Sequence, residues 1–266
     1  MTATDEGLRT RRQGLRRLFG ARMTLVLLAA ILLAAPFAYL LDQVISSGPL
    51  SRLDRSLAES MHLDACSNAA AVASARVISF LGGTAWDIVL VLVVVALLLR
   101  RSEERLAIFL AVTSVTGSLL NSGVKLVVDR DRPALTGCFL GGNAGQSFPS
   151  GHTMNTTIIY GAIALVFLSL LRRAWRPVLL GCYVVWIVAM GWSRMTLGAH
   201  YLSDVLGGAV LGMAWLAIGV AVFQAWRKQE GKRPAKPLQE GIEPEATNIG
   251  SQPPESRDLQ APTRVP

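Results

Sequence analysis

The sequence predicts an all-α, polytopic membrane protein: a bundle of six transmembrane helices with a short amphipathic helical segment outside the membrane. Hydrophobic residues make up 52% of the 266 residues and charged residues only 17%, whereas about a quarter of an ordinary soluble domain is charged. The 26 Lys and Arg residues cluster between long apolar stretches, which is typical of membrane loops and needs no nucleic-acid partner. This composition excludes a disordered chain, a disulfide-rich scaffold and a typical cytosolic enzyme.

Six apolar stretches approach or exceed the roughly 20 residues that a helix needs to cross a hydrocarbon core of about 30 Å. They must be helical, because lipid provides no water to satisfy an open backbone. Their Val, Ile and Leu runs are too long for buried strands. In chain order, the expected spans are Met23–Leu41, Val77–Leu99, Leu106–Val128, Thr153–Leu171, Pro177–Trp192 and Tyr201–Gln224.

The first stretch follows six arginines within residues 1–22. A signal peptide would look similar, with a possible cleavage region at Ala34 and Ala35. The stretch is longer than the usual hydrophobic region of a signal peptide, so we expect a retained anchor. In either case the chain emerges outside the membrane after residue 42.

The largest expected external loop, residues 43–76, follows this anchor. Four apolar residues in it fall at helical spacing with charged residues between them. This pattern predicts a short amphipathic helix lying on the membrane surface, and a helix packed on the bundle is the alternative. The four residues are Leu50, Leu53, Leu57 and Met61.

The basic residues predict the orientation of the spans. With the N-terminus inside, six spans place nineteen of the 26 Lys and Arg residues on the cytoplasmic side. We therefore expect a basic cytoplasmic N-terminus (1–22), a membrane domain (23–225) and a disordered cytoplasmic tail (226–266) in a multi-pass protein of the plasma membrane. Seven cations remain outside, against the bias: Arg52, Arg55, Arg76, Lys125, Arg130, Arg132 and Arg194.

Three polar segments stand at the outer ends of the expected spans, where a membrane bundle should avoid such residues. One ends the third span, one opens the fourth, and one joins the fifth to the sixth. The topology places all three at the same face of the membrane. The segments are Lys125 to Arg132-Pro133, the run Pro149-Ser150-Gly151-His152, and Ser193-Arg194 with His200 and Asp204.

Five residues of these segments have the chemistry of a phosphate site. Arg132 and Arg194 offer planar guanidinium groups that match phosphate oxygens, and Lys125 adds a point charge. Ser150 reads as the N-cap of the fourth span, so free backbone N–H groups of the next turn would face an anion. Gly151 lets the backbone approach that anion closely. Together they predict a site for a phosphoryl group and its transition-state charge.

Two of the three histidines fall in the same cluster. Asp204 follows His200 by four residues, so both lie on one helix face. A carboxylate that binds one imidazole nitrogen fixes the tautomer and leaves the other nitrogen free to attack. His200 is therefore the expected nucleophile, Asp204 its orienting group, and His152 the general acid.

The three segments resemble the signature motifs of the type 2 phosphatidic acid phosphatase superfamily, which contains membrane lipid phosphate phosphatases, bacterial acid phosphatases and vanadium haloperoxidases. Every motif position is present in order, and the six-span layout extends the resemblance over about 23–224. One motif alone would be weak evidence, but three with a matching topology are specific. The motifs are Lys125-x6-Arg132-Pro133, Pro149-Ser150-Gly151-His152 and Ser193-Arg194-x5-His200-x3-Asp204.

This resemblance implies a metal-independent phosphohydrolase that needs no cofactor and forms a phosphohistidine at His200. It implies that Asp204 supports His200 and that His152 protonates the leaving group and then activates water. It further implies that the site lies near the outer leaflet. The implied phosphate-binding residues are Lys125, Arg132, Ser150, Gly151 and Arg194.

The expected substrate is a lipid phosphate or diphosphate of the bilayer, hydrolysed at the external face. An isoprenoid diphosphate such as undecaprenyl diphosphate is the first choice by family analogy. Phosphatidic acid, phosphatidylglycerol phosphate and diacylglycerol pyrophosphate are the alternatives. A vanadium-dependent oxidase and a non-catalytic lipid-phosphate binding or transport protein are rivals from other classes.

Four residues near the motifs receive simple interpretations. Arg130 is not a motif position, and we expect it to extend toward the membrane interface. Asp129 and Asp131 are expected to pair with the basic groups rather than to bind a metal. His62 matches no motif and is expected on the surface.

Other residues suggest structural roles. A disulfide between Cys66 and Cys138 is a hypothesis, because both lie on the oxidising side. Gly208 and Gly212 form a small-xxx-small step that allows close helix packing, by default within the chain. Polar residues of the third and fourth spans either line the site or hydrogen-bond between helices: Thr116, Asn121, Ser122, Asn155, Thr156 and Thr157.

Overall fold

The computed structural model describes residues 34–135, 145–233 and 235–245, and these residues form helices joined by turns and short loops. An apolar helix over Ala34–Ile45 comes first. The elements that follow are α2 (Pro49–Ser67), α3 (Ala69–Phe80), α4 (Thr84–Arg100), α5 (Glu104–Val128), α6 (Gly151–Leu168), the short 3₁₀ helix η1 (Arg173–Trp175), α7 (Arg176–Thr196), α8 (Leu202–Gln229) and α9 (Pro237–Glu240).

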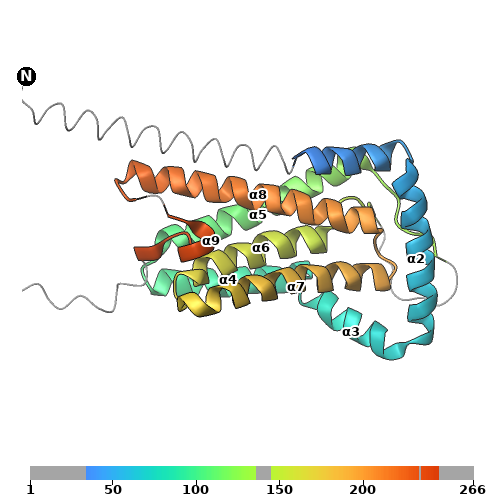
Figure 1. Ribbon diagram of the computed structural model, residues 1–266, viewed down its shortest axis with the longest axis horizontal. Coiled ribbons are helices and arrows are strands. Elements are labelled where there is room, and N and C mark those ends of the chain that lie inside the picture. Colours follow the sequence, from blue (N-terminus) through green and yellow to red (C-terminus); the bar gives the residue numbers. More distant parts are fainter. Residues whose placement is uncertain (1–33, 136–144, 234, 246–266) are drawn as a thin grey trace, which may run out of the picture.

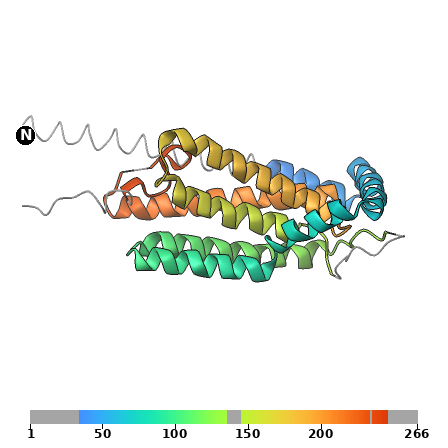
Figure 2. The same cartoon turned by 90° about the horizontal axis from the view of Figure 1, so that it is seen from below.

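The long helices form one bundle. Figure 1 shows α4 to α8 along the long axis of the molecule, with α2 running across one end, and Figure 2 shows the same arrangement after a 90° turn. Helix α6 lies at the centre because it contacts α5, α7 and α8. In the most apolar window of α6, 67% of the residues are buried, compared with 28% in that of α8. The outer helices therefore carry the apolar surface that faces lipid.

The third to sixth expected spans are present as α5, α6, α7 and α8, each within a segment long and apolar enough to cross a membrane. The structure has four such helices among the described residues, or five when α3 and α4 count as one bent span. The helix Ala34–Ile45 is the described part of the expected first span, Met23–Leu41. The remainder of that span lies outside the described residues, so the count of six is still an expectation.

The second expected span, Val77–Leu99, is not one straight helix. It is broken after Phe80, and α3 and α4 meet at 45°. Gly82 sits at the break, where a Cβ would lie 2.8 Å from Thr156 Oγ1 on α6. The hydroxyl of Tyr160 on α6 donates a hydrogen bond to the backbone carbonyl of Leu81, a group that the break leaves without a helical partner. Contacts with α6 thus fix a turn that hydropathy alone reads as continuous helix.

Helix α2 packs on the bundle, which was the alternative expectation for the external loop. Of the expected apolar face, Leu53 is 47% exposed, while Leu50, Leu57 and Met61 are half-buried. The buried stripe is small and polar, because its members approach the α7–α8 turn closely and find partners there. It consists of Ser51, Asp54, Ala58, His62 and Ala65.

Two smaller expectations concern this helix. The interpretation of His62 as a surface residue is wrong: it is buried, and its Nδ1 faces Gly198 in the turn between α7 and α8. Cys66 is disulfide-bonded, while Cys182 is free. The expected partner of Cys66, Cys138, lies outside the described residues.

The sequence predicts disorder throughout 226–266, yet the described part of this tail is packed. Helix α8 continues to Gln229, and α9 contacts α6. Glu243 is buried and forms ion pairs with Arg105 and Arg227, which hold the tail against the bundle. Ion pairs therefore order a segment whose composition predicts disorder. Residues 246–266 lie outside the described residues.

Helix α8 approaches α6 through its glycines. A Cβ on Gly208 would lie 2.6 Å from the carbonyl oxygen of Ser150, and one on Gly212 would lie 3.0 Å from that of Met154. The small-xxx-small step thus packs within the chain, as expected. It brings the first turn of α8 against the first turn of α6.

We predict that Gly208→Ala destabilises the protein by about 1–3 kcal/mol, because backbone atoms of α6 cannot yield as a side chain can. Gly181→Ala in α7 is the matched control, since a Cβ there meets nothing within 4 Å. Ala in a helix interior is also favoured over Gly. Thermal unfolding in detergent should show a lower melting temperature for Gly208→Ala only. Equal melting temperatures for the two variants would contradict this packing.

Candidate active site

The three polar segments meet at the end of the bundle that α2 crosses (Figure 1). Ser150 caps α6 by accepting a hydrogen bond from the backbone N–H of Thr153. The backbone N–H of Ser150 also donates to the carbonyl of Asp204, over 2.9 Å, and so ties α6 to α8. The eight expected site residues all lie in these segments: Lys125, Arg132, Ser150, Gly151, His152, Arg194, His200 and Asp204.

His200 and Asp204 face each other in the interior. His200 Nδ1 lies 3.5 Å from Asp204 Oδ2, within ion-pair distance but without a hydrogen bond, and His200 is only 2% exposed. Asp204 Oδ2 also accepts the backbone N–H of Tyr201 over 2.8 Å, which caps the start of α8. Because Nδ1 points at the carboxylate, Nε2 is the nitrogen available for chemistry.

The charge state of His200 follows from its surroundings. Burial lowers the pKa of His200 to about 4, Asp204 acts against this shift, and Arg194 and Arg132 act with it. His200 is therefore neutral near pH 7. A neutral imidazole keeps the lone pair that a nucleophile needs.

A cavity of about 320 Å³ opens beside His200. Lys125 and Arg132 line it, together with Gly151 and His152. Its volume fits a phosphoryl group with part of a larger molecule. Two cations, two imidazoles and the first turn of α6 thus surround one space.

The three motif cations are held by neutral groups. Among the described residues, Lys125, Arg132 and Arg194 form no ion pair with a carboxylate, so their charge remains available to an anion. Burial lowers the pKa of Arg132, and Asp204 only partly offsets this shift. Their hydrogen-bond acceptors are the backbone carbonyl of Gln146 for Lys125, those of Gly145 and Ala199 for Arg132, and the hydroxyl of Ser79 for Arg194.

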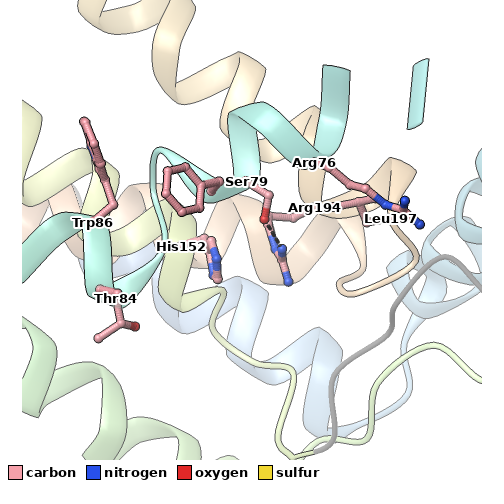
Figure 3. Close-up of a pocket in the computed structure, with 10 residues that line it drawn as sticks. Arg76, Ser79, Thr84, Trp86, His152, Arg194 and Leu197 are labelled. Carbon is pink, nitrogen blue, oxygen red and sulfur yellow. Dashed lines mark hydrogen bonds between the residues drawn. The ribbon is translucent and has the colours of Figure 1, made fainter. Parts of the chain in front are cut away.

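His152 stands between two cavities. It lines the cavity of Lys125 and also a second one, of about 590 Å³, which Arg194 lines as well. Figure 3 shows His152 and Arg194 together in this second cavity, with the aromatic side chain of Trp86 beyond His152. The two cavities share His152 and Thr84 as lining residues.

Some polar residues of α5 and α6 line the cavity, and some form hydrogen bonds between the two helices, so both expected roles occur. Asn121, Ser122 and Asn155 line the cavity of Lys125. Ser118 also donates a hydrogen bond to Asn155, and thereby joins the two helices. Thr157 instead donates to the carbonyl of Thr153 within α6.

The interpretation of Arg130 as an interfacial residue is wrong. Its guanidinium donates to Asp204 Oδ1 over 2.6 Å and to Asp54 Oδ2 over 2.8 Å, and it stacks 4.2 Å from the ring centroid of Tyr201. Burial lowers the pKa of Arg130, but the charges and hydrogen bonds of Asp204 and Asp54 raise it overall. Arg130 thus compensates the buried carboxylate that faces His200.

Asp54 of α2 is the other residue that the sequence did not indicate. It is 1% exposed and accepts the backbone N–H of Ser203 over 2.9 Å. Its position could have indicated burial, because Asp54 lies at helical spacing with the small and polar residues that form the buried stripe of α2. The expectation that Asp129 and Asp131 pair with basic groups is wrong for the described part of the chain, where neither forms an ion pair. The carboxylate of Asp129 instead accepts a hydrogen bond from the side-chain amide of Gln146.

Comparison with known proteins gives concordant results. Residues 104–228 match the PAP2 superfamily. The chain is 38% identical over 101 residues to phosphatidylglycerophosphatase B of Bacillus subtilis (37% of this chain, 48% of that protein) and 32% identical over 125 residues to a lipid A 1-phosphatase of Rhizobium johnstonii (44% and 47%). It spans about half the length of these curated relatives.

A solved structure shares the fold. It is the crystal structure of a transmembrane PAP2-type phosphatidylglycerolphosphate phosphatase from Bacillus subtilis, with a TM-score of 0.63 and 24% identity. The match covers 75% of this chain and 96% of that one. The helical membrane architecture is therefore shared with a known transmembrane protein.

We predict that Asp54→Asn destabilises the protein by about 1–3 kcal/mol. The Asp54 carboxylate accepts hydrogen bonds from Arg130 and from the backbone N–H and hydroxyl of Ser203, and an amide leaves at least one of these buried donors unpaired. Asp64→Asn is the matched control, since Asp64 is exposed on the same helix. Thermal unfolding in detergent should show a lower melting temperature for Asp54→Asn than for Asp64→Asn. If the two variants melted together, Asp54 would not hold α2 to the site.

Proposed function

Because residues 104–228 belong to the PAP2 superfamily, we propose that the protein is an integral-membrane phosphatase that hydrolyses a lipid phosphate or diphosphate through a phosphohistidine. The observation that carries this proposal is the pair formed by a neutral, buried His200 and Asp204 beside unpaired cations. A binding protein would need the cations but not the oriented histidine. The names of both curated relatives, which are phosphatases, support the same class of reaction.

In the first step, Nε2 of His200 attacks phosphorus and forms a P–N bond, while the bond to the leaving oxygen breaks. Asp204 stabilises the positive charge that develops on the imidazole. His152 donates a proton to the leaving oxygen. In the second step, His152 takes a proton from water, which attacks the phosphohistidine and releases inorganic phosphate.

Three cations stabilise the transferring phosphoryl group: Lys125, Arg132 and Arg194. The backbone N–H groups of Ser150 and Gly151, at the start of α6, stabilise it as well. One opposite charge at 4 Å contributes about 4 kcal/mol at an effective dielectric constant near 20. Because no carboxylate neutralises these cations among the described residues, their field acts on the substrate. This arrangement lets the chain's own side chains supply the charge stabilisation, so we propose a metal-independent reaction.

The site is proposed to face the outside, with both termini in the cytoplasm. The turns that join α4 to α5 and α6 to α7 carry six arginines within 100–105 and 172–176, at the end of the bundle opposite α2. The positive-inside rule places that end in the cytoplasm. The substrate head group then enters from the outer leaflet while its tails stay in lipid.

An isoprenoid diphosphate such as undecaprenyl diphosphate is the proposed substrate. Phosphatidic acid, phosphatidylglycerol phosphate and diacylglycerol pyrophosphate are the alternatives within the class. The catalytic pair of His200 and Asp204 argues against a non-catalytic lipid-binding or transport protein. The apolar helices argue against a vanadium-dependent oxidase, since family members of that kind are mostly soluble.

The decisive experiment measures phosphate release by purified protein in detergent with EDTA, over a panel of isoprenoid diphosphates and phospholipid monoesters. We expect metal-free release that His200→Ala lowers at least about a thousandfold, as loss of a covalent nucleophile does. His62→Gln is the matched control, because His62 is a similarly buried histidine outside the site. Equal losses in the two variants, or no release from any lipid by folded protein, would contradict the proposal.

A further inference from the structure

A second cavity adjoins the proposed reaction centre. It is open to the surface, has a volume of about 590 Å³ and lies between the α3–α4 break and the C-terminal end of α7. His152 and Arg194 are among its lining residues, whereas His200, Lys125 and Arg132 are not. The two cavities therefore meet at His152 and Thr84, and only the first contains the proposed nucleophile.

The positions of His200 and His152 indicate where the leaving group of the substrate lies. A phosphoryl transfer needs the nucleophile and the leaving oxygen roughly in line, on opposite sides of phosphorus. His200 is on one side, and the general acid for the leaving oxygen, His152, opens into the second cavity. The leaving group then extends past His152 into that cavity.

The second cavity carries two cations. Arg194 is 4% exposed, and its Nε has no hydrogen-bond partner among the described residues. Arg76 on α3 lines the same cavity and forms no ion pair within the described part of the chain. Figure 3 shows Arg194 between His152 and Arg76, so that positive charge continues away from the reaction centre.

The opposite wall is apolar. Phe80 and Trp86 line it with rings 5.9 Å apart, and Phe80 is largely exposed. Trp86 is held in place by a hydrogen bond of its indole N–H to Tyr160. One wall thus suits a hydrocarbon chain and the other a negatively charged group.

We propose that the second cavity binds the leaving group of the substrate and that Arg76 contacts a phosphate on that leaving group. This inference rests on the proposed function and specifies its substrate class as lipid diphosphates. When such a substrate reacts, the terminal P–O bond breaks and the bridging oxygen leaves with a lipid monophosphate, whose charge Arg76 and Arg194 meet. A lipid monophosphate instead releases an uncharged alcohol, which offers Arg76 nothing to bind.

The test compares Arg76→Gln with the unaltered protein, in detergent, on two pairs of substrates. Each pair shares one tail: geranylgeranyl diphosphate with its monophosphate, and diacylglycerol pyrophosphate with phosphatidic acid. We expect Arg76→Gln to lower the ratio of kcat/KM for diphosphate over monophosphate about tenfold, the effect of one lost charged hydrogen bond. Arg76→Lys should restore most of that ratio.

Arg52→Gln is the matched control, because Arg52 is an exposed arginine of α2 outside the second cavity. It should leave the ratio as it is. An unchanged ratio in Arg76→Gln, or a preference of the unaltered protein for monophosphates, would overturn the leaving-group site. In both cases, release of phosphate from either pair of substrates would still support the proposed phosphatase. If the protein hydrolysed neither pair, both proposals would be wrong.

Discussion

The buried carboxylate of Asp204 is the constraint on which the end of the bundle depends. It is fully buried, and an uncompensated charge there would be very costly. Arg130 supplies the opposite charge, and the backbone N–H of Tyr201 supplies a hydrogen bond. Asp54 also pairs with Arg130 and accepts the backbone N–H of Ser203, which holds α2 across the end of the bundle. A single buried carboxylate thereby fixes the start of α8, the loop after α5 and helix α2.

The same end of the bundle separates two kinds of cation. Arg130 is satisfied by carboxylates and serves the structure, whereas Lys125, Arg132 and Arg194 are held by neutral acceptors. This division explains how several positive groups can gather where lipid would disfavour them. The paired cation stabilises the fold, and the unpaired ones remain available for an anionic substrate.

Hydropathy and motif spacing predicted α5 to α8 and the residues that gather at their outer ends, because both depend on local pattern. The break at Gly82 was missed, since it arises from contact with α6 and leaves the hydropathy of the span unchanged. Arg130 and Asp54 were missed for a related reason. They are 76 residues apart, and only the folded chain brings them together. The packed tail up to residue 245 likewise depends on ion pairs with distant arginines.

The central claim is that phosphate passes through His200. The most direct measurement uses the His152→Ala variant with a lipid diphosphate that carries ³²P in its terminal phosphate. The leaving group is a lipid monophosphate, whose second pKa of about 6 lets it depart without a general acid. Hydrolysis of the intermediate still lacks its general base and should be slow. After an alkaline quench, which preserves phosphohistidine, the account predicts a base-stable, acid-labile label on the peptide that contains His200. Phosphate release without any labelled peptide, or a label on a different residue, would contradict it.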